Sequence, residues 1–279
     1  MLFTRDIKRK IRSVGNIEQI CRAMKAVSSV KLRRAQQRIR GARPYADHMS
    51  ELLYRFAAGG AEHPYFQPRP VHAVGLIVIT ADKGLAGGFN VNIIRGAVTA
   101  CQAAPAAGLI TIGRKGTVFF TRRRYDVRAT LSPMGPEPDF LQIAPLADTA
   151  ARLFLEGAWD QVRLIYSAFR GGARTEIAEA QVLPIRPPRG MAPALDLLCE
   201  PPAAQILGRL LPRYLRTVLF TAVLDSVASE HAARVAAMTQ ATNNAEDMIR
   251  SLTLDYNKAR QAGITGELLD IVGTAEALR

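Results

Sequence analysis

Two long proline-free segments with helical apolar periodicity lie at the two ends of this chain, and they constrain its fold more than any local motif. One runs from Asp6 to about Arg43 and the other from Ser229 to Leu278. Each helix is too long to be covered by a small globular core, so the economical solution is an antiparallel coiled coil of the two ends. The recurring apolar positions are Ile7, Ile11, Val14, Ile17, Ile20, Met24 and Val27 in the first segment, and Val235, Met238, Ile249, Leu252, Ile264, Leu268 and Val272 in the second.

Between these ends, strand-like and helix-like segments alternate along the chain. Short β-branched runs predict strands at 73–80, 109–113, near 126–130, at 161–169 and within 173–185. Helical patterns lie between them at 91–103, 115–123 and about 146–156. Strands that alternate with helices are typical of βαβ units and a mostly parallel sheet, which can carry one antiparallel edge strand.

We therefore expect an α/β chain, with an antiparallel coiled coil of the N- and C-terminal helices and a central Rossmann-like α/β domain. The expected boundaries are 1–62 for the N-terminal coiled-coil helix, 73–188 for the central domain and 203–279 for the C-terminal coiled-coil helix. At about 1.5 Å per residue, about 70 residues of helix would approach about 100 Å. Such a coiled coil is expected to protrude and to need a partner along its free length.

The positive charge of the chain is concentrated in its first helix. The whole chain carries a net charge of +13, and residues 1–43 hold thirteen basic residues against two acidic ones. Residues 230–279 hold five basic against seven acidic residues, so the other helix is close to neutral. A solvated face, a nucleic-acid surface and an acidic protein partner all stay open as explanations. Nucleic acid fits less well, because no aromatic residue for base stacking lies between Phe3 and Tyr45 and no DNA-binding motif accompanies the charge.

Cysteine and hydropathy patterns argue against metal centres, disulfides and membrane insertion. The cysteines at 21, 101 and 199 are odd in number and have no metal-ligand spacing, which favours a reducing compartment. The N-terminus runs straight into charged helix without the apolar region of a signal peptide. The longest apolar runs are the length of strands, so no direct membrane insertion is expected.

One local motif looks like a binding site, the turn DKGLAGGFN at residues 82–90. It follows a predicted strand and opens a predicted helix, as a phosphate-binding loop would. It is neither a dinucleotide-binding fingerprint nor a P-loop, because no Gly-Lys-Ser/Thr follows. We favour a tight structural turn that uses glycine for positive φ over a phosphate site.

Catalytic constellations are otherwise missing from the sequence. There is no nucleophile elbow, no His-Glu-x-x-His and no paired-carboxylate motif. The histidines at 48, 63, 72 and 231 are scattered, and His231 is predicted to be a solvated surface residue. We expect no catalytic residue, no cofactor and no metal.

Three segments together resemble the γ subunit of the rotary F-type ATP synthase. They are IKRKIRSVGNIEQICRAMKAVSSVKLRRAQ at the N-terminal end, the turn DKGLAGGFN, and SEHAARVAAMTQATNNA followed by LDYNKARQAGITGELLDIV at the C-terminal end. The elements match in order over the whole chain, and the terminal segments are much more specific than the central domain.

The resemblance implies a role that residue spacing could not supply. A γ subunit is the central shaft: its coiled coil enters the hexamer of α and β subunits, and its globular part sits against ε and the membrane c-ring. It is a non-catalytic subunit that couples ion translocation to ATP synthesis or hydrolysis. The family further implies a peripheral position on the cytoplasmic face of the bacterial inner membrane. The basic first helix would then face acidic loops of β.

A few residues are carried over from the family by position match. Met24 and Lys25 align with the contact zone near the β lever loops. For Met24, a purely structural role in the core of the coiled coil is an equally open interpretation. Arg260 with Gln261 sits where a β loop grips the shaft. The remaining matched positions, at which rotor–stator interaction and coupling are expected, are Arg234, Thr265 and Glu267.

Other positions depart from the family pattern. Ala86 stands where cysteine is usual, and Ile17 and Cys21 replace common threonines. Gly263 and Gly266 interrupt the final helix at about 1 kcal/mol each relative to alanine, which predicts a softer or more closely packed tip. Pro212 falls where the family's helix usually continues, so we predict a kink or a fresh helix start there.

The departures leave alternatives open. A γ-like subunit of a second, Na⁺-translocating ATPase complex is one of them. A nucleotide-binding enzyme built on the central domain and a basic nucleic-acid-binding coiled coil are the others, each separable from the shaft by a binding assay.

Overall fold

The computed structural model describes residues 2–59, 62–135, 137–171, 175–187 and 202–277. Its residues group into two compact units. We call Met1–Ser28 with Val235–Arg279 the coiled-coil unit, and Ser29–Arg234 the α/β unit. Helices α1 (Leu2–Ala58) and α5 (Ala203–Ala277) each contribute residues to both units.

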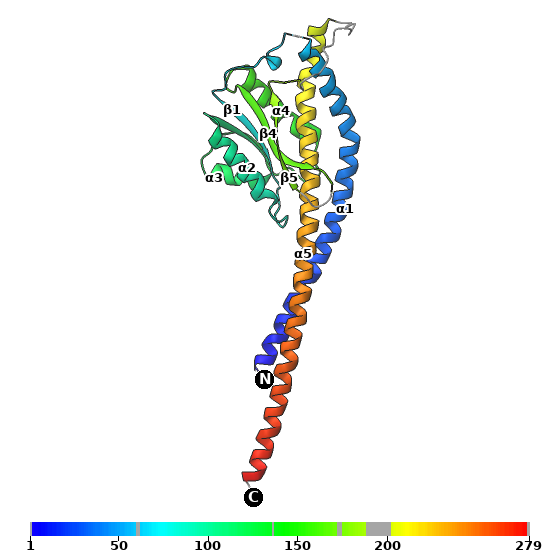
Figure 1. Cartoon of the computed structure of the whole chain (residues 1–279), viewed down its shortest axis with the longest axis vertical. Coiled ribbons are helices and arrows are strands. Elements are labelled where there is room, and N and C mark those ends of the chain that lie inside the picture. Colours follow the sequence, from blue (N-terminus) through cyan, green and yellow to red (C-terminus); the bar gives the residue numbers. More distant parts are fainter. Residues whose placement is uncertain (1, 60–61, 136, 172–174, 188–201, 278–279) are drawn as a thin grey trace. The chain divides into compact units, whose positions relative to one another are not determined.

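The α/β unit is built on a five-stranded sheet in the order β3-β2-β1-β4-β5 (Figure 1). Strands β1 to β4 are parallel, and β5 pairs antiparallel with β4 at the edge. This confirms the expected α/β class and the single antiparallel edge strand. The bounds are β1 Val74–Ile79, β2 Ala107–Ile112, β3 Val127–Leu131, β4 Gln161–Phe169 and β5 Thr175–Leu183, with α2 Phe89–Ala103, α3 Arg114–Arg122, α4 Phe140–Leu155 and a short 3₁₀ turn at Pro64–Phe66.

Helices cover both faces of the sheet, which explains why β1 reads as an unbroken apolar run. Leu76 and Val78 face a core formed with α2 and α3, whereas Ile77 and Ile79 face a core formed with α1, α4 and α5. Figure 1 shows α2 and α3 on one side of the strands and α4 on the other. All six residues of β1 are buried, as expected for a central parallel strand with both faces covered.

A single tryptophan is packed directly on the backbone of two neighbouring strands. A Cβ atom added at Gly75 of β1 would lie 2.1 Å from the Trp159 ring, and one added at Gly108 of β2 would lie 2.7 Å from its Nε1. Gly75 and Gly108 are paired in register. The absence of a side chain at both glycines therefore lets the Trp159 indole ring, which is 3 % exposed, pack directly against the backbone of the two strands.

Both terminal helices continue through prolines. α1 passes Pro44 and ends at Ala58, and α5 runs unbroken across Pro212, so the predicted fresh helix start there is wrong. A proline inside a helix costs about 3 kcal/mol. Burial of one large apolar side chain returns about 1.5–3 kcal/mol, and Leu207, Leu211 and Leu215 are all buried beside Pro212.

Helix α4 starts earlier than the predicted position near residue 146. Its N-cap is Asp139, whose carboxylate accepts a hydrogen bond from the Leu141 backbone N–H. This satisfies one of the unpaired donors of the first turn. Within the described residues, no helix is both long enough and apolar enough to cross a membrane.

Candidate functional site

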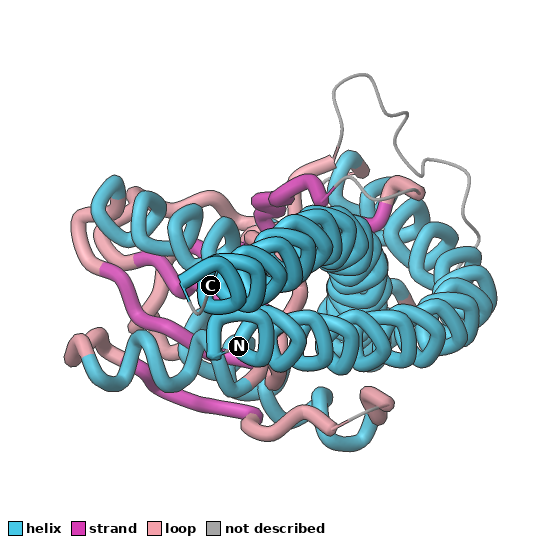
Figure 2. Tube along the Cα trace, turned by 90° about the horizontal axis from the view of Figure 1, so that it is seen from below, coloured by secondary structure: helices cyan, strands magenta, loops and turns pink. Residues whose placement is uncertain are grey.

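In the coiled-coil unit, α1 and α5 lie side by side through a heptad seam (Figure 1; Figure 2). The covered positions of α1 include 7, 11, 14, 18, 21, 25 and 28, and this alternate spacing by four and three residues is the pattern of knobs-into-holes packing. The buried members of the seam are Ile7, Cys21 and Ser28 on α1 and Met238, Thr242 and Ala245 on α5, with Ile11, Val14, Ile249 and Leu252 half-buried.

An ion pair ties the two helices together beside the seam. The Arg22 guanidinium lies 2.7 Å from a carboxylate oxygen of Glu246 on α5 and 2.7 Å from one of Glu18 on α1. Sequence reasoning missed this contact, because Arg22 and Glu246 are 224 residues apart. Arg22 is largely exposed, so the pair contributes more to the register of the two helices than to stability.

Part of the predicted apolar stripe of α1 does not face α5. Ile17, Ile20 and Val27 are 52 %, 59 % and 56 % exposed. These residues lie about 100° around the helix from the seam, given 3.6 residues per turn. The helix therefore carries two apolar stripes, and α5 covers only one. We call Ile17, Ile20 and Val27, with half-buried Met24 between them, the outer apolar stripe.

The last turns of α5 also leave apolar side chains open. Beyond Leu252 no described side chain is buried. The large exposed residues there are Leu254, Ile264, Leu268 and Leu269. A Cβ atom added at Gly263 or Gly266 would meet nothing within 4 Å, so the closer packing expected at these glycines is not formed by the described part of this chain.

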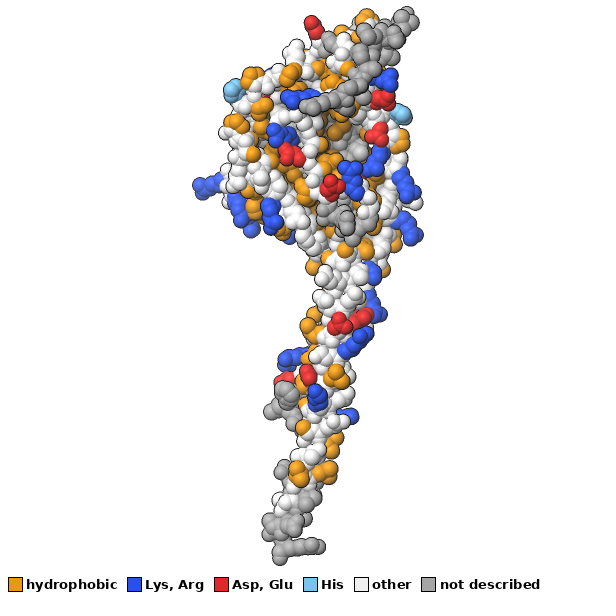
Figure 3. All heavy atoms as spheres, in the orientation of Figure 1, with side chains coloured by type: hydrophobic (Ala, Val, Ile, Leu, Met, Phe, Trp, Pro, Cys, Tyr) orange, Lys and Arg blue, Asp and Glu red, His pale blue; other side chains and the backbone are white. Residues whose placement is uncertain are grey.

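The residues carried over from the family occupy different environments. Arg260, Gln261 and Thr265 are exposed on α5, whereas Met24 and Lys25 are half-buried on α1. The side chain of Glu267 and that of Val272 lie outside the described residues, although both positions are helical. Figure 3 shows hydrophobic side chains open on the surface of the coiled-coil unit, interspersed with Lys and Arg.

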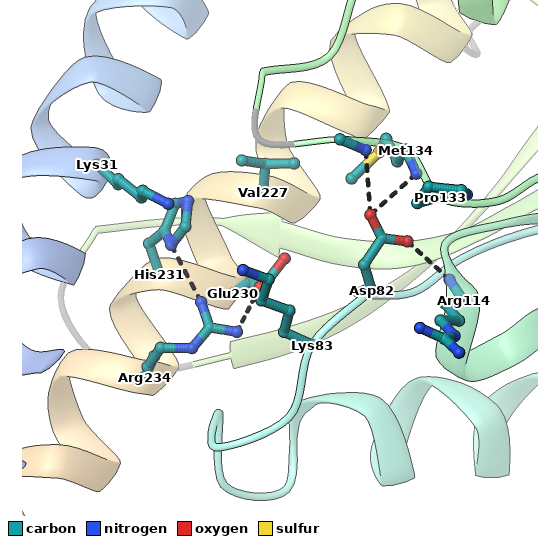
Figure 4. Close-up of a pocket in the computed structure, with 11 residues that line it drawn as sticks. Lys31, Asp82, Lys83, Arg114, Pro133, Met134, Val227, Glu230, His231 and Arg234 are labelled. Atoms are coloured by element: carbon teal, nitrogen blue, oxygen red, sulfur yellow. Dashed lines mark hydrogen bonds and ion pairs between the residues drawn. The ribbon is translucent and has the colours of Figure 1, made fainter.

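Arg234, the remaining predicted residue, is held inside the α/β unit and is only 7 % exposed. Its Nε and Nη2 donate to the carbonyl oxygen of Gly84, and Nη2 also pairs with the carboxylate of Glu230 one helical turn earlier. Nη1 lies 3.2 Å from Nδ1 of His231. Figure 4 shows this group of side chains on α5. Arg234 thus ties α5 to the glycine-rich turn.

The turn at residues 82–90 is held by its own polar side chains. One carboxylate oxygen of Asp82 accepts from the Arg114 backbone N–H, and the other accepts from the N–H groups of Met134 and Gly135. Asn90 Oδ1 accepts from the Ala81 N–H at 2.9 Å. Gly87 has φ of 55°, a conformation that glycine adopts at little cost. These contacts support the structural interpretation of the turn.

A pocket of about 320 Å³ opens where strands β1, β2 and β3 end (Figure 4). The turn after β1 supplies Asp82 and Lys83, and α3 supplies Arg114. Helix α1 contributes Lys31, and the segment after β3 contributes residues 133–135. Helix α5 closes the pocket with Val227, Glu230, His231 and Arg234. All of these residues belong to the α/β unit.

The prediction that His231 is a solvated surface residue is wrong, since it is 8 % exposed. Burial lowers the pKa of His231 to about 4, and the charges of Arg234 and Lys31 act in the same direction. Burial also raises the pKa of Glu230, against the opposing effect of Arg234. Helical position alone could not reveal this burial, because the sheet ends that cover α5 come from other parts of the chain.

Sequence reasoning also missed the hub at Thr80, the residue after β1. Its Oγ1 accepts from the Gly116 N–H at 2.8 Å and donates to the Ile112 carbonyl at 3.1 Å. A Cβ atom at Gly113 would lie 2.0 Å from the Thr80 carbonyl oxygen. The sequence signal for this contact was the pair of glycines at the start of α3, Gly113 and Gly116, because glycine permits another group to approach the backbone closely.

Comparisons with known proteins agree over the full length of the chain. The ATP synthase family model matches residues 4–278. The ATP synthase gamma chain of Moorella thermoacetica is 42 % identical over 285 residues, covering all of both chains. That of Desulforamulus reducens is 39 % identical over 282 residues, again over the whole of each chain.

Solved structures show the same fold at lower sequence identity. A chain of the mitochondrial ATP synthase of Euglena gracilis, in its OSCP/F1/c-ring structure, aligns with a TM-score of 0.74 and 21 % identity, over 99 % of this chain and 94 % of that one. A chain of the central stalk and c-ring of the Tetrahymena thermophila enzyme aligns with a TM-score of 0.61 and 24 % identity, over 80 % and 99 %.

Proposed function

The chain belongs to the ATP synthase gamma-chain family, and from this we propose that it is the rotating central stalk that couples ion translocation through a membrane c-ring to ATP synthesis or hydrolysis in a hexamer of α and β subunits. Gamma chains are non-catalytic subunits of the complex. In this proposal the chain makes and breaks no bonds. It transmits rotation by presenting different side chains to each β subunit in turn.

The observation that carries the proposal is the uncovered apolar surface of the coiled-coil unit. The outer apolar stripe of α1 and the exposed leucines and isoleucine near the end of α5 lack a cover in the described chain. Apolar side chains gathered along a helix surface mark an interface. A sleeve formed by the α and β subunits would bury both sets.

The charge of α1 supports an acidic partner. Lys8, Lys10 and Arg12 are exposed, and no ion pair is formed by them within the part of the chain that the structure describes. Opposite charge on the surrounding loops would steer the shaft into register and would suppress wrong alignments. The same charge would keep the uncovered helix soluble before assembly.

The carried-over residues divide into two proposed roles. Met24, Lys25, Arg260, Gln261, Thr265 and Glu267 are proposed to contact the β subunits directly. Arg234 is proposed to affect coupling indirectly, by positioning α5, because its guanidinium is hydrogen-bonded to Gly84 and paired with Glu230. It would hold α5 against the turn while torque passes along the helix.

The proposed partners are the α and β subunits, an ε subunit and the c-ring, at the cytoplasmic face of a bacterial inner membrane. The test is co-expression of this chain with the α, β, ε and ring subunits from the same genome, followed by purification on a tag carried by β. Recovery of this chain in the complex, and ATP-driven rotation of a bead fixed to it, would support the proposal. A complex that forms and turns over ATP equally well without this chain would refute it.

The same purified complex can be used to identify the ion that it translocates. Reconstituted into vesicles, the complex is assayed for ATP-driven uptake of H⁺ and of Na⁺. Uptake of one ion only distinguishes a proton-translocating synthase from the Na⁺-translocating ATPase considered above.

A further inference from the structure

The pocket at the ends of β1, β2 and β3 contains more positive than negative charge. Lys31, Lys83, Arg114 and Arg234 line it, against Asp82 and Glu230. Arg234 is engaged by Glu230. Lys31, Lys83 and Arg114 form no ion pair among the described residues, and all three are exposed. They come from α1, from the turn after β1 and from the first position of α3, as Figure 4 shows.

The carboxylates of the pocket already accept hydrogen bonds from other groups. Asp82 accepts three backbone N–H bonds, from Arg114, Met134 and Gly135. Glu230 is paired with Arg234. Among the described residues, neither carboxylate forms an ion pair with Lys31, Lys83 or Arg114. The three cations that line the pocket therefore lack an ionic partner among the described residues, and a bound anion would supply one.

The backbone donors at the start of α3 are also occupied. The Arg114 N–H is taken by Asp82, the Lys115 N–H by the Ala81 carbonyl and the Gly116 N–H by Thr80 Oγ1. An anion here cannot be cradled by amides in the manner of a P-loop. Recognition of an anion must therefore come from the cationic side chains of the lining.

We propose that this pocket binds a small polyphosphate anion of the size of inorganic pyrophosphate, with Lys31, Lys83 and Arg114 as its ligands. A volume of about 320 Å³ lies at the lower end of the range for ligand pockets, which suits a pyrophosphate better than a whole nucleotide. Arginine and lysine are the side chains that hold phosphate oxygens in charge-assisted hydrogen bonds. The bound anion would bridge α1, the glycine-rich turn and α3, and so stabilise the α/β unit.

The test is isothermal titration of the full-length chain with pyrophosphate, phosphate and ATP at constant ionic strength. The test variant is Lys83→Gln with Arg114→Gln, which keeps the Arg114 backbone N–H that Asp82 needs. The matched control is Lys115→Gln with Arg122→Gln, which removes the same charge from α3 at exposed positions outside the pocket lining.

Saturable binding of one pyrophosphate per chain is expected, with affinity at least about tenfold weaker in the test variant and unchanged in the control. ATP should compete through its phosphates. Equal weakening of pyrophosphate binding in both variants would overturn the proposal, because it would show general charge attraction. Absence of saturable binding, or binding of ATP without binding of pyrophosphate, would also overturn it. Should the test variant fail to fold, Lys31→Gln on α1 must show the same loss of affinity.

Discussion

The guanidinium of Arg234 donates to the carbonyl oxygen of Gly84 through Nε at 3.3 Å and Nη2 at 3.2 Å, across 150 residues of sequence. Gly84 is exposed in the turn after β1, whereas Arg234 is the last residue of the α/β unit. A buried cation thus connects the glycine-rich turn with the long C-terminal helix.

Replacing Arg234 by alanine should destabilise the α/β unit by about 3 kcal/mol. The change leaves the Glu230 carboxylate buried without its partner, and breaking a buried pair costs about 3–5 kcal/mol. Urea unfolding of the full chain measures the loss. Arg250→Ala, which breaks an exposed pair with Asp247, should change the free energy of unfolding by less than about 0.5 kcal/mol. Equal effects would contradict the role assigned to Arg234.

Stability should fall as the pH is lowered from about 6.5 to about 4, with His231 as one cause. Its folded pKa is lowered to about 4 from an ordinary value of 6.5. Between these values the unfolded chain binds a proton that the folded chain does not, so lowering the pH favours unfolding. The effect of this residue is at most about 3 kcal/mol.

The variant His231→Gln isolates that contribution. Glu230 titrates in the opposite sense, because its raised pKa makes its protonated form relatively favoured in the folded state. Glu230 is present in both proteins, so its effect largely cancels. The free energy of unfolding of wild type minus that of His231→Gln, measured by urea unfolding from pH 7 to pH 4, should fall with the pH. A constant difference across that range would show that His231 is not held neutral.

Alanine should have opposite effects at two glycines. At Gly75 the new methyl would overlap the Trp159 ring, and overpacking a core costs about 1–3 kcal/mol or more. At Gly41, inside α1, the methyl would meet nothing within 4 Å, and alanine is favoured in a helix by about 1 kcal/mol. Urea unfolding compares the two variants, and destabilisation of both to the same extent would contradict the packing described for Trp159.

Serine in place of Ile17, Ile20 and Val27 should leave the isolated chain folded but impair assembly. These side chains are already exposed, so the free energy of unfolding should move by less than about 0.5 kcal/mol for each. Recovery of the α and β subunits with the tagged chain should fall. The single change Ile7→Ser in the seam serves as the contrast, because it should weaken the coiled coil itself. Normal assembly of the triple variant would refute the proposed sleeve.

Replacing Gly263 and Gly266 by alanine should stiffen the end of α5. Nothing lies within 4 Å of either added methyl, and each change favours helix by about 1 kcal/mol. Amide hydrogen exchange in this segment should slow by about fivefold for each change. Unchanged exchange would mean that the glycines do not limit the helix here.

Local patterns were sufficient to locate almost every element. The β-branched run ending in a glycine-rich turn located β1, and β4 was placed at its observed bounds, because a buried strand between turn residues leaves little choice of register. Residue spacing also predicted helices at both ends, but it placed Ile17, Ile20 and Val27 in the seam, and the structure leaves these side chains exposed. A kink or a fresh helix start was predicted at Pro212, because neighbouring residues do not reveal the apolar contacts that outweigh the cost of a proline inside a helix.

Residue spacing thus predicted, without any coordinates, long helices at the two ends of the chain and a mostly parallel sheet in its central segment, since helical and strand spacing are properties of neighbouring residues. Folding settled which of the two stripes of α1 is covered, that His231 and Arg234 are buried, and that Lys31, Lys83 and Arg114 meet at one pocket. Those outcomes depend on segments far apart in the chain, and burial and electrostatics are set by what lies nearby in space.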